Sequence, residues 1–342
     1  MTAARSSYIV GPVYDWAFFL GPPVLALLLG IGIAGTRFDA QPFQLFGRST
    51  TGAALALGTL VHAHLVAVFV RSHGNPEVFR RYRYRFLLVP VLLFAAVRSA
   101  PVMAVAATVV ATFWDVWHSG AQTFGLGRIY DRNAGNPPHT ARWLDFFLNQ
   151  LLYAGPILAG VTMIDHFNVF ADFEEVGATF LTGVPAFMER THSLWRLGVV
   201  GAGTAFVLVY LVWHWRLRRS GYRPSPYKVL LVASTGLCSI YCWGFDSWGE
   251  AFFVMNVLHA VQYLALMWAT EHRRLLERLR STPLGARKGV LLGAFLIAVL
   301  SYGAFAQLLD PKAETLWAVT IVVSLLHFWY DGFIWSVRRA EV

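Results

Sequence analysis

Long apolar stretches separated by short polar connections dominate the pattern of this chain. The stretches run to roughly 17–25 residues, which is the length that a helix needs to cross the hydrocarbon core of a bilayer. They do not show the residue-by-residue alternation that marks a membrane β-strand. The pattern therefore predicts an all-α, polytopic transmembrane helical bundle. We expect about ten spans, at approximately residues 16–36, 52–71, 84–99, 101–122, 143–165, 194–215, 227–245, 249–270, 288–308 and 315–336.

Positively charged residues gather in every second connection between these spans. The longest of the other connections, residues 166–193, carries acidic side chains and a lone Arg190. Because Lys and Arg are enriched in cytoplasmic loops, we expect both termini on the cytoplasmic side of the inner, cytoplasmic membrane. The expected cytoplasmic connections hold, among others, Arg71, Arg80, Arg81, Arg83, Arg85, Arg128, Arg132, Arg142, Arg216, Arg218, Arg219, Arg223, Lys228, Arg273, Arg274, Arg278, Arg280, Arg287 and Lys288.

Composition excludes a soluble globular protein. The 342 residues are 56% hydrophobic and 14% charged, with a mean hydropathy of +0.52, and these values are typical of a membrane protein. The formal charge of +9 comes from residues between the apolar runs, so we expect no nucleic-acid partner. No repeat or long polar stretch marks a further domain, and we expect a single integral-membrane domain over residues 1–342. Cys238 and Cys242 stand four residues apart in one apolar run, a spacing that favours packing over redox chemistry.

Histidines interrupt four of the apolar runs at a similar depth: His62 with His64, then His118, His259 and His327. A buried imidazole is costly in hydrocarbon unless a partner satisfies it. All four spans run in the same direction under the expected topology, and the heights of their histidines differ by roughly one to two helical turns. The pattern therefore predicts one shared site. A two-residue step turns a helix by about 200°, so we expect only one of His62 and His64 to enter it.

Acidic side chains accompany two of these histidines on the same helix face. Asp115 lies three residues before His118, and Asp331 lies four residues after His327. Imidazole and carboxylate groups from several helices are the ligands of iron, zinc or manganese. We therefore expect a metal centre in which Asp115 and Asp331 act as ligands or proton acceptors. Outer-sphere partners are expected among Gln122, Asn256, Gln262 and Tyr330.

Other roles for the same residues stay open at this point. The histidines and aspartates also suit a transporter or a proton or metal pathway, two of the histidines suit haem ligation, and single histidines suit hydrogen bonds between helices. The remaining histidines, such as His214, lie in loops or near helix ends, where we expect water or the membrane interface to surround them.

The segments around the intramembrane histidines resemble those of a class of membrane enzymes. The segments are His62-Ala63-His64, Asp115-x-x-His118, His259-x-x-Gln262 and His327-x-x-x-Asp331. This set resembles the His-rich integral-membrane non-haem iron oxygenases, which include desaturases, hydroxylases and alkane monooxygenases and which carry His-x-x-His-His boxes instead. The resemblance implies an iron-dependent membrane oxidoreductase, with one or two iron ions, that oxidises a lipid or another hydrophobic molecule. Its electrons would come from a separate donor, and the sequence leaves the substrate, the donor and the oligomeric state open.

Overall fold

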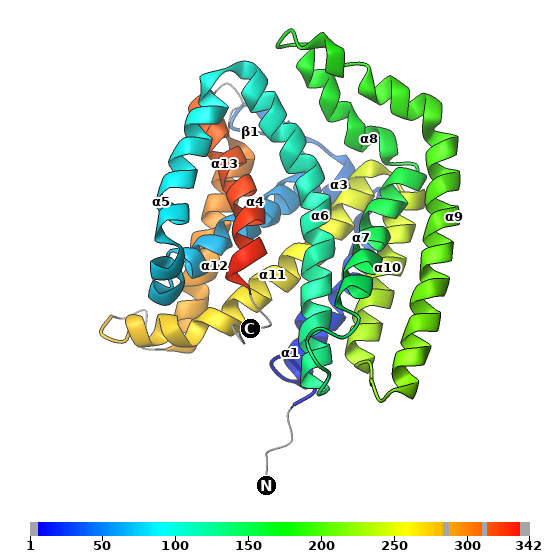
Figure 1. The fold of residues 1–342 in the computed structure, drawn as a ribbon. Helices are drawn as coiled ribbons and strands as arrows, with labels where there is room; N and C mark the ends of the chain where they lie inside the picture. The colour runs from blue at the N-terminus through cyan, green and yellow to red at the C-terminus, as the bar shows by residue number, and fades with distance from the viewer. Residues whose placement is uncertain (1–5, 283–286, 310–312, 336–342) are drawn as a thin grey trace. The chain divides into compact units, whose positions relative to one another are not determined.

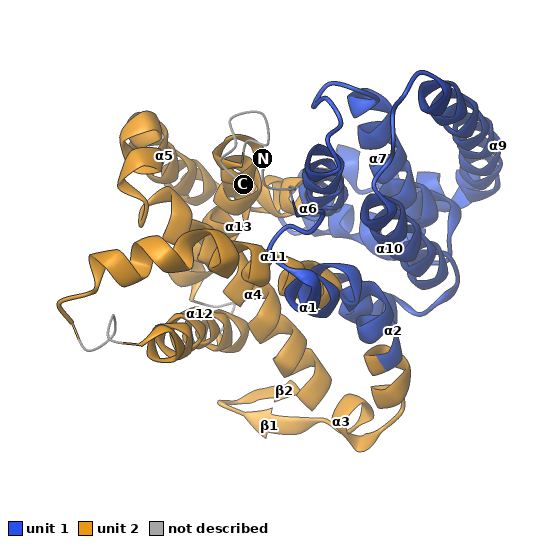
Figure 2. Cartoon of the chain, turned by 90° about the horizontal axis from the view of Figure 1, so that it is seen from below, with its two compact units in different colours: residues 1–28, 112–255, 336–342 blue, residues 29–111, 256–335 orange. Residues whose placement is uncertain are grey.

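Helices make up nearly all of the regular structure in the part of the chain that is described. The computed structural model describes residues 6–282, 287–309 and 313–335 (Figure 1). Among these residues the exception is an antiparallel hairpin of β1 (Phe43–Leu45) and β2 (Arg48–Thr50). The all-helical fold class is thus confirmed. The chain divides into two compact units, coloured separately in Figure 2, and the single-domain expectation stays a prediction.

The apolar runs of the sequence form helices of membrane-spanning length. In the described ranges, seven helices are long and apolar enough to cross a bilayer, and two bent pairs raise this number to nine. The bent pairs join α1 (Pro12–Asp15) and η1 (Trp16–Leu20) to α2 (Pro22–Ile33), and α7 (Arg142–Ala159) to α8 (Met163–Phe167) and η2 (Asn168–Phe173). The seven are α4 (Gly52–Ser72), α6 (Pro101–Asn133), the segment Thr179–Arg219 with α9 (Val184–Arg219), α10 (Pro226–Phe245), α11 (Trp248–Arg278), α12 (Lys288–Leu308) and α13 (Glu314–Ile334).

The third predicted span, residues 84–99, lies in α5 (Pro76–Ser99), which is not among the qualifying helices. Arginines stand near both of its ends, so its uncharged stretch covers only residues 86–97. This is shorter than the roughly 20 apolar residues of a typical span. The helix is also kinked at Tyr82, where φ is −120° and ψ is 20°, and it contains Pro90.

Unit 1 comprises residues 1–28, 112–255 and 336–342. The described part of this unit is residues 6–28 and 112–255. Within it, α7 packs against α9 and α10, and α8 packs against α9. The outward face of α9 exposes large apolar side chains, with Leu194 at 68% and Leu197 at 72%. An apolar helix face without a protein neighbour is the surface that lipid covers.

Unit 2 comprises residues 29–111 and 256–335, and its centre is α4 packed against α12 and α13, with α5 beside α13. Glycines bring α4 and α12 close together. A Cβ atom on Gly303 of α12 would stand 2.1 Å from the carbonyl oxygen of Thr59, and one on Gly58 of α4 would stand 1.9 Å from the Gln307 side chain. Small residues at such crossings are typical of membrane helices. This packing fixes the position of α4, which carries two of the predicted site histidines.

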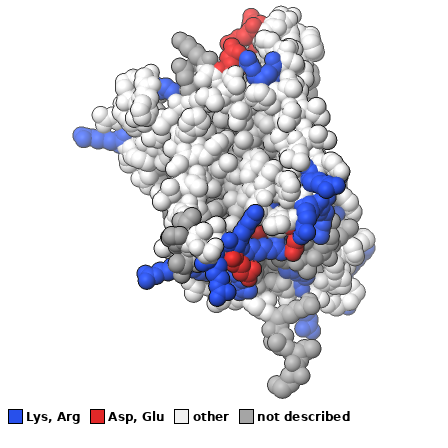
Figure 3. All heavy atoms as spheres, turned by 90° about the vertical axis from the view of Figure 1, so that its left-hand side faces the viewer, with Lys and Arg blue, Asp and Glu red and all other residues white. Residues whose placement is uncertain are grey.

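Charged side chains are unevenly distributed over the surface. On the face drawn in Figure 3, most Lys and Arg side chains gather toward one end, and a largely uncharged area adjoins them. The long apolar helices indicate a membrane protein, and the identity of the membrane stays a prediction.

Candidate metal centre

Three of the predicted site histidines meet in unit 2. His64 comes from α4, His259 from α11 and His327 from α13, and one ring nitrogen from each lies within 4.8 Å of the other two. None of the three residues is more than 1% exposed. The ring of His64 meets those of His259 and His327 edge to face, with both centroid distances at 5.0 Å. Imidazoles from three helices thus surround one buried point.

The structure distinguishes the two histidines of α4. The Nδ1 atom of His62 lies 2.8 Å from the carbonyl oxygen of Gly58, one turn earlier in the same helix, and its side chain is half-buried. His64 instead faces α11 and α13. This outcome follows from the helical turn of about 200° between the two positions. The sequence predicted that one of them enters the cluster, and the structure places His64 there.

The hydrogen bond of His327 defines which of its nitrogens carries the proton. Its Nδ1 atom lies 3.1 Å from the backbone oxygen of Leu65, and a carbonyl only accepts, so this nitrogen donates. In a neutral ring the lone pair then resides on Nε2, which lies 3.6 Å from Oδ2 of Asp331. This is the tautomer in which Nε2 of His327 can act as a metal ligand.

His64 has an unmet hydrogen-bonding requirement. Neither of its ring nitrogens has a hydrogen-bond partner among the described residues, although the side chain is almost completely buried. Buried polar atoms are nearly always satisfied, and each exception calls for an explanation such as a bound ion. A metal ligated by His64 would supply the missing interaction for one nitrogen.

A tyrosine, an aspartate and a tryptophan flank the three histidines. The Tyr263 ring centroid lies 4.6 Å from that of His327 and 5.9 Å from that of His64. Its hydroxyl donates to Oδ1 of Asp331 at 3.0 Å, and Nε1 of Trp335 donates to the same oxygen at 2.9 Å. Two donors on one oxygen hold the carboxylate so that its other oxygen faces His327.

A buried ion pair supports this flank. Arg71, on α4, pairs with Glu271 of α11 and donates from Nε to the backbone oxygen of Ile334 at 3.2 Å. Its guanidinium carbon lies 4.2 Å from the centre of a Trp335 ring. Asn75 donates to the second oxygen of Glu271 at 3.3 Å. These contacts join the ends of α4, α11 and α13 and set the position of Trp335.

The other predicted site residues lie in different surroundings. His118, Asp115 and Gln122 are on α6 in unit 1, and their part in the site stays a prediction. Asn256 and Gln262 are buried on α11 on either side of His259.

The two tyrosines near the histidines have different neighbours. Tyr330, which we expected near the metal, packs in an aromatic group with Phe86 at 4.7 Å and Phe69 at 6.0 Å. Tyr263, four residues after His259, is the tyrosine whose ring contacts the histidine cluster. Its helical spacing from His259 is the signal that points to it in the sequence.

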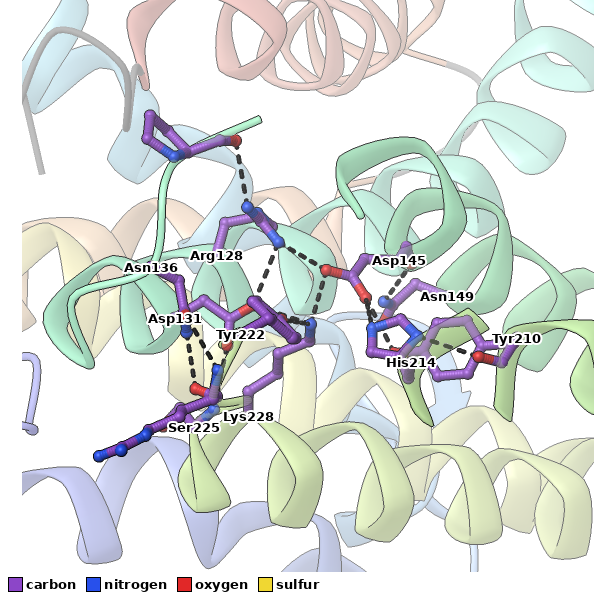
Figure 4. Close-up of polar contacts among 12 residues, drawn as sticks. Arg128, Asp131, Asn136, Asp145, Asn149, Tyr210, His214, Tyr222, Ser225 and Lys228 are labelled. Carbon is purple, nitrogen blue, oxygen red and sulfur yellow. Dashed lines mark hydrogen bonds and ion pairs between the residues drawn. The ribbon is translucent and has the colours of Figure 1, made fainter. Parts of the chain in front are cut away.

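Unit 1 contains a buried charge network that the sequence did not predict (Figure 4). The Lys228 ammonium lies 2.8 Å from Asp131 and 2.6 Å from Asp145, and the Arg128 guanidinium lies 3.1 Å and 2.6 Å from the same two carboxylates. All four side chains are at most 5% exposed. We expected Arg128 and Lys228 in cytoplasmic connections. The structure places them in the helices α6 and α10, where they pair with acidic residues of α6 and α7.

Further side chains complete the hydrogen bonding of this network. Tyr210 donates to Asp145 at 2.8 Å, and Tyr222 donates to Asp131 at 2.5 Å. Burial, followed by the charge of Asp131, raises the pKa of Tyr222, so its hydroxyl stays a donor. His214, which we expected in water or at the membrane interface, is 9% exposed, and its Nε2 lies 3.5 Å from Asp145. The two carboxylates and the two cations balance one another, as a structural network requires.

Comparisons with known proteins add no assignment to these two sites, because no protein-family model, curated protein or solved structure matches the chain.

Proposed function

We propose that unit 2 binds a transition-metal ion through His64, His259 and His327, and that the protein is an integral-membrane, metal-dependent oxidoreductase. The observation that carries the proposal is the convergence of three buried imidazole nitrogens within 4.8 Å of one another. A tetrahedral ion with bonds of about 2.1 Å needs nitrogens about 3.4 Å apart, which small side-chain rotations would reach. Imidazole suits iron and zinc, and we expect non-haem iron, with zinc or manganese as the other metals to test.

Asp331 supplies the negative charge that three neutral imidazoles lack. A divalent cation among apolar helices is costly unless anionic groups are close. The Oδ2 atom of Asp331 lies 3.6 Å from Nε2 of His327, on the side where the lone pair of His327 points. The second ion expected from the sequence stays a prediction.

Haem is less compatible with this arrangement than a free ion. In a haem with two axial histidines the macrocycle occupies the plane between them. Here a third imidazole lies within the same short distance of the other two, in the region where a macrocycle would lie. The geometry thus favours a non-haem metal.

Redox chemistry on a hydrophobic substrate explains more features of the histidine site than transport of a metal ion does. Three ligands leave positions open for dioxygen or substrate, and Asp331 provides a group that holds or accepts a proton. The rings of Tyr263 and Phe328 adjoin His327, and the three histidines are at most 1% exposed, so bulk water would be excluded from the site. A lipid or another hydrophobic molecule from the membrane is the expected substrate, and a separate partner would supply electrons. Movement of the metal through the protein is the rival outcome of the test.

We also propose ten crossings of the inner membrane with both termini in the cytoplasm. This requires α5 to cross together with the nine other candidates. Its support is the pairing of α5 along α13: the Tyr82 hydroxyl donates to the Phe333 carbonyl, and Arg98 pairs with Glu314 at the opposite end of α13. Labelling of single cysteines placed in the Arg-rich connections and in residues 166–193 would test it, because only the latter should react from outside.

The central test is the metal content and absorption spectrum of the purified full-length protein. Stoichiometric iron without a Soret band is expected, and a Soret band or a protein without metal would contradict the proposal. The metal-free protein should then be loaded with ferrous iron, zinc or manganese in lipid vesicles. Dioxygen consumption with iron and a reductant, and none with zinc, is expected of an oxidoreductase. Passage of the metal into the vesicle lumen would instead indicate transport.

A further inference from the structure

Tyr263 stands out among the tyrosines of unit 2 by its surroundings. It is 1% exposed, its ring contacts those of His64 and His327, and its hydroxyl donates to a carboxylate. We propose that Tyr263 is a redox-active residue that gives one electron to the metal centre and its phenolic proton to Asp331. This inference rests on the proposed function, because the oxidant is the metal centre after its reaction with dioxygen.

The contacts allow the step to balance. One electron leaves the Tyr263 ring for the oxidised metal, which is reduced by one unit. The phenolic O–H bond breaks, and the proton moves along the 3.0 Å hydrogen bond to Oδ1 of Asp331. A neutral tyrosyl radical results, so no unpaired charge is created on the ring in the apolar interior. An electron from the separate donor and the return of the proton from Asp331 restore the phenol.

Neighbouring aromatic residues lack this combination. Trp335 donates to the same carboxylate, but the Arg71 guanidinium lies 4.2 Å from its ring, and this positive charge disfavours removal of an electron. Tyr330 is equally buried and belongs to the same unit. Its hydroxyl, however, has no hydrogen-bond partner within the described ranges, so no group is placed to take its proton.

The experiment compares Tyr263→Phe with Tyr330→Phe in the full-length protein. Each variant is loaded with ferrous iron, exposed to dioxygen, frozen within the reaction time and examined by electron paramagnetic resonance. We expect a tyrosyl radical in the wild type and in Tyr330→Phe, and its loss in Tyr263→Phe with the iron content unchanged. Compared at equal bound iron, Asp331→Asn should also lose the radical, because an amide does not accept the proton.

The outcomes separate this inference from the proposed function. A radical that persists in Tyr263→Phe would overturn the inference, as would a wild-type protein that binds iron and consumes dioxygen without a tyrosyl signal. In the second case the metal centre and the oxidoreductase proposal stand. Absence of bound iron would remove both. If Tyr263→Phe fails to fold, wild-type protein grown with ring-deuterated tyrosine decides whether a tyrosine carries the signal, since the spectrum must then narrow.

Discussion

The two buried polar clusters of this protein differ in how well their members satisfy one another. In unit 1, Arg128 and Lys228 neutralise Asp131 and Asp145, and tyrosines donate to the carboxylates. In unit 2, three imidazoles face one another, and His64 has no hydrogen-bond partner in the described chain. A satisfied network needs nothing further and stabilises the fold, whereas an unsatisfied cluster needs a ligand. Burial and ionisable residues alone therefore do not identify a functional site.

We expect the largest effect when a histidine of the unit 2 cluster is substituted, because the metal should then be lost. Loss of a residue that hydrogen-bonds to a metal ligand typically lowers metal affinity roughly 10–100-fold. His64→Ala removes one of the three ligands themselves, so we expect a larger loss of metal affinity. His62→Ala is the matched control, because His62 bonds to its own helix instead. Metal content after dialysis against a weak chelator measures the effect. Equal metal in the two variants would contradict the assignment.

A charge removed from unit 1 should cost stability and leave metal binding unchanged. Lys228→Met leaves two carboxylates to share Arg128, and breaking such a buried pair typically costs about 3–5 kcal/mol. Lys288→Met is the control, since Lys288 is exposed at the start of α12. Thermal unfolding in detergent micelles measures the difference. An unchanged Tm for Lys228→Met would mean that the network is not structural.

An intermediate effect is expected where α12 supports the histidine-bearing α4. Gly303→Ala places a methyl group 2.1 Å from the Thr59 carbonyl oxygen, and overpacking of this kind costs about 1–3 kcal/mol. Because α4 must move, metal affinity should fall as well. Gly289→Ala on the same helix has open space around it and should be neutral or slightly stabilising. Titration of the metal-free variants with ferrous iron, together with their Tm values, tests both parts.

The smallest effect is expected for an exposed ion pair. Arg98 and Glu314 lie 2.8 Å apart, but their side chains are 39% and 72% exposed. Pairs of this kind contribute at most about 1 kcal/mol. A double-mutant cycle with Arg98→Ala and Glu314→Ala measures the coupling. If the coupling free energy were as large as the stability lost in Lys228→Met, burial would not explain the difference between the exposed pair and the buried network.

Several helices could be predicted closely from the sequence. The run predicted at residues 52–71 is α4 (Gly52–Ser72), and the run at 288–308 is α12 (Lys288–Leu308). Polar residues end these runs sharply, so the local pattern suffices. The run at 143–165 instead bends by 99° after α7. There Val161 donates to Gly244 of α10, and a Cβ on Gly160 would stand 2.4 Å from the Trp243 oxygen. Contacts between distant segments accompany this bend, and a hydropathy pattern does not record them.

Part of the candidate site could likewise be predicted from the sequence, and part depends on how the helices pack. Depth and helical spacing predicted a histidine cluster, and the structure brings His64, His259 and His327 together. The choice of His64 over His62, and the contacts of Tyr263 with the cluster, depend on how each helix is rotated about its axis. The partners of Arg128 and Lys228 depend on which helix ends meet. A sequence that shows charges in short connections does not distinguish solvated side chains from paired ones.

The amino-acid sequence by itself determined that this chain forms apolar helices of membrane-spanning length and that histidines interrupt several of them. These properties depend on hydrophobic periodicity and length, which are local. The tertiary structure decided which imidazoles face one another, which carboxylate stands beside them and which charges neutralise one another. The physical reason is that hydrogen bonds, ion pairs and metal ligation act over a few ångströms between residues up to hundreds of positions apart. Only the packing of the helices sets those distances.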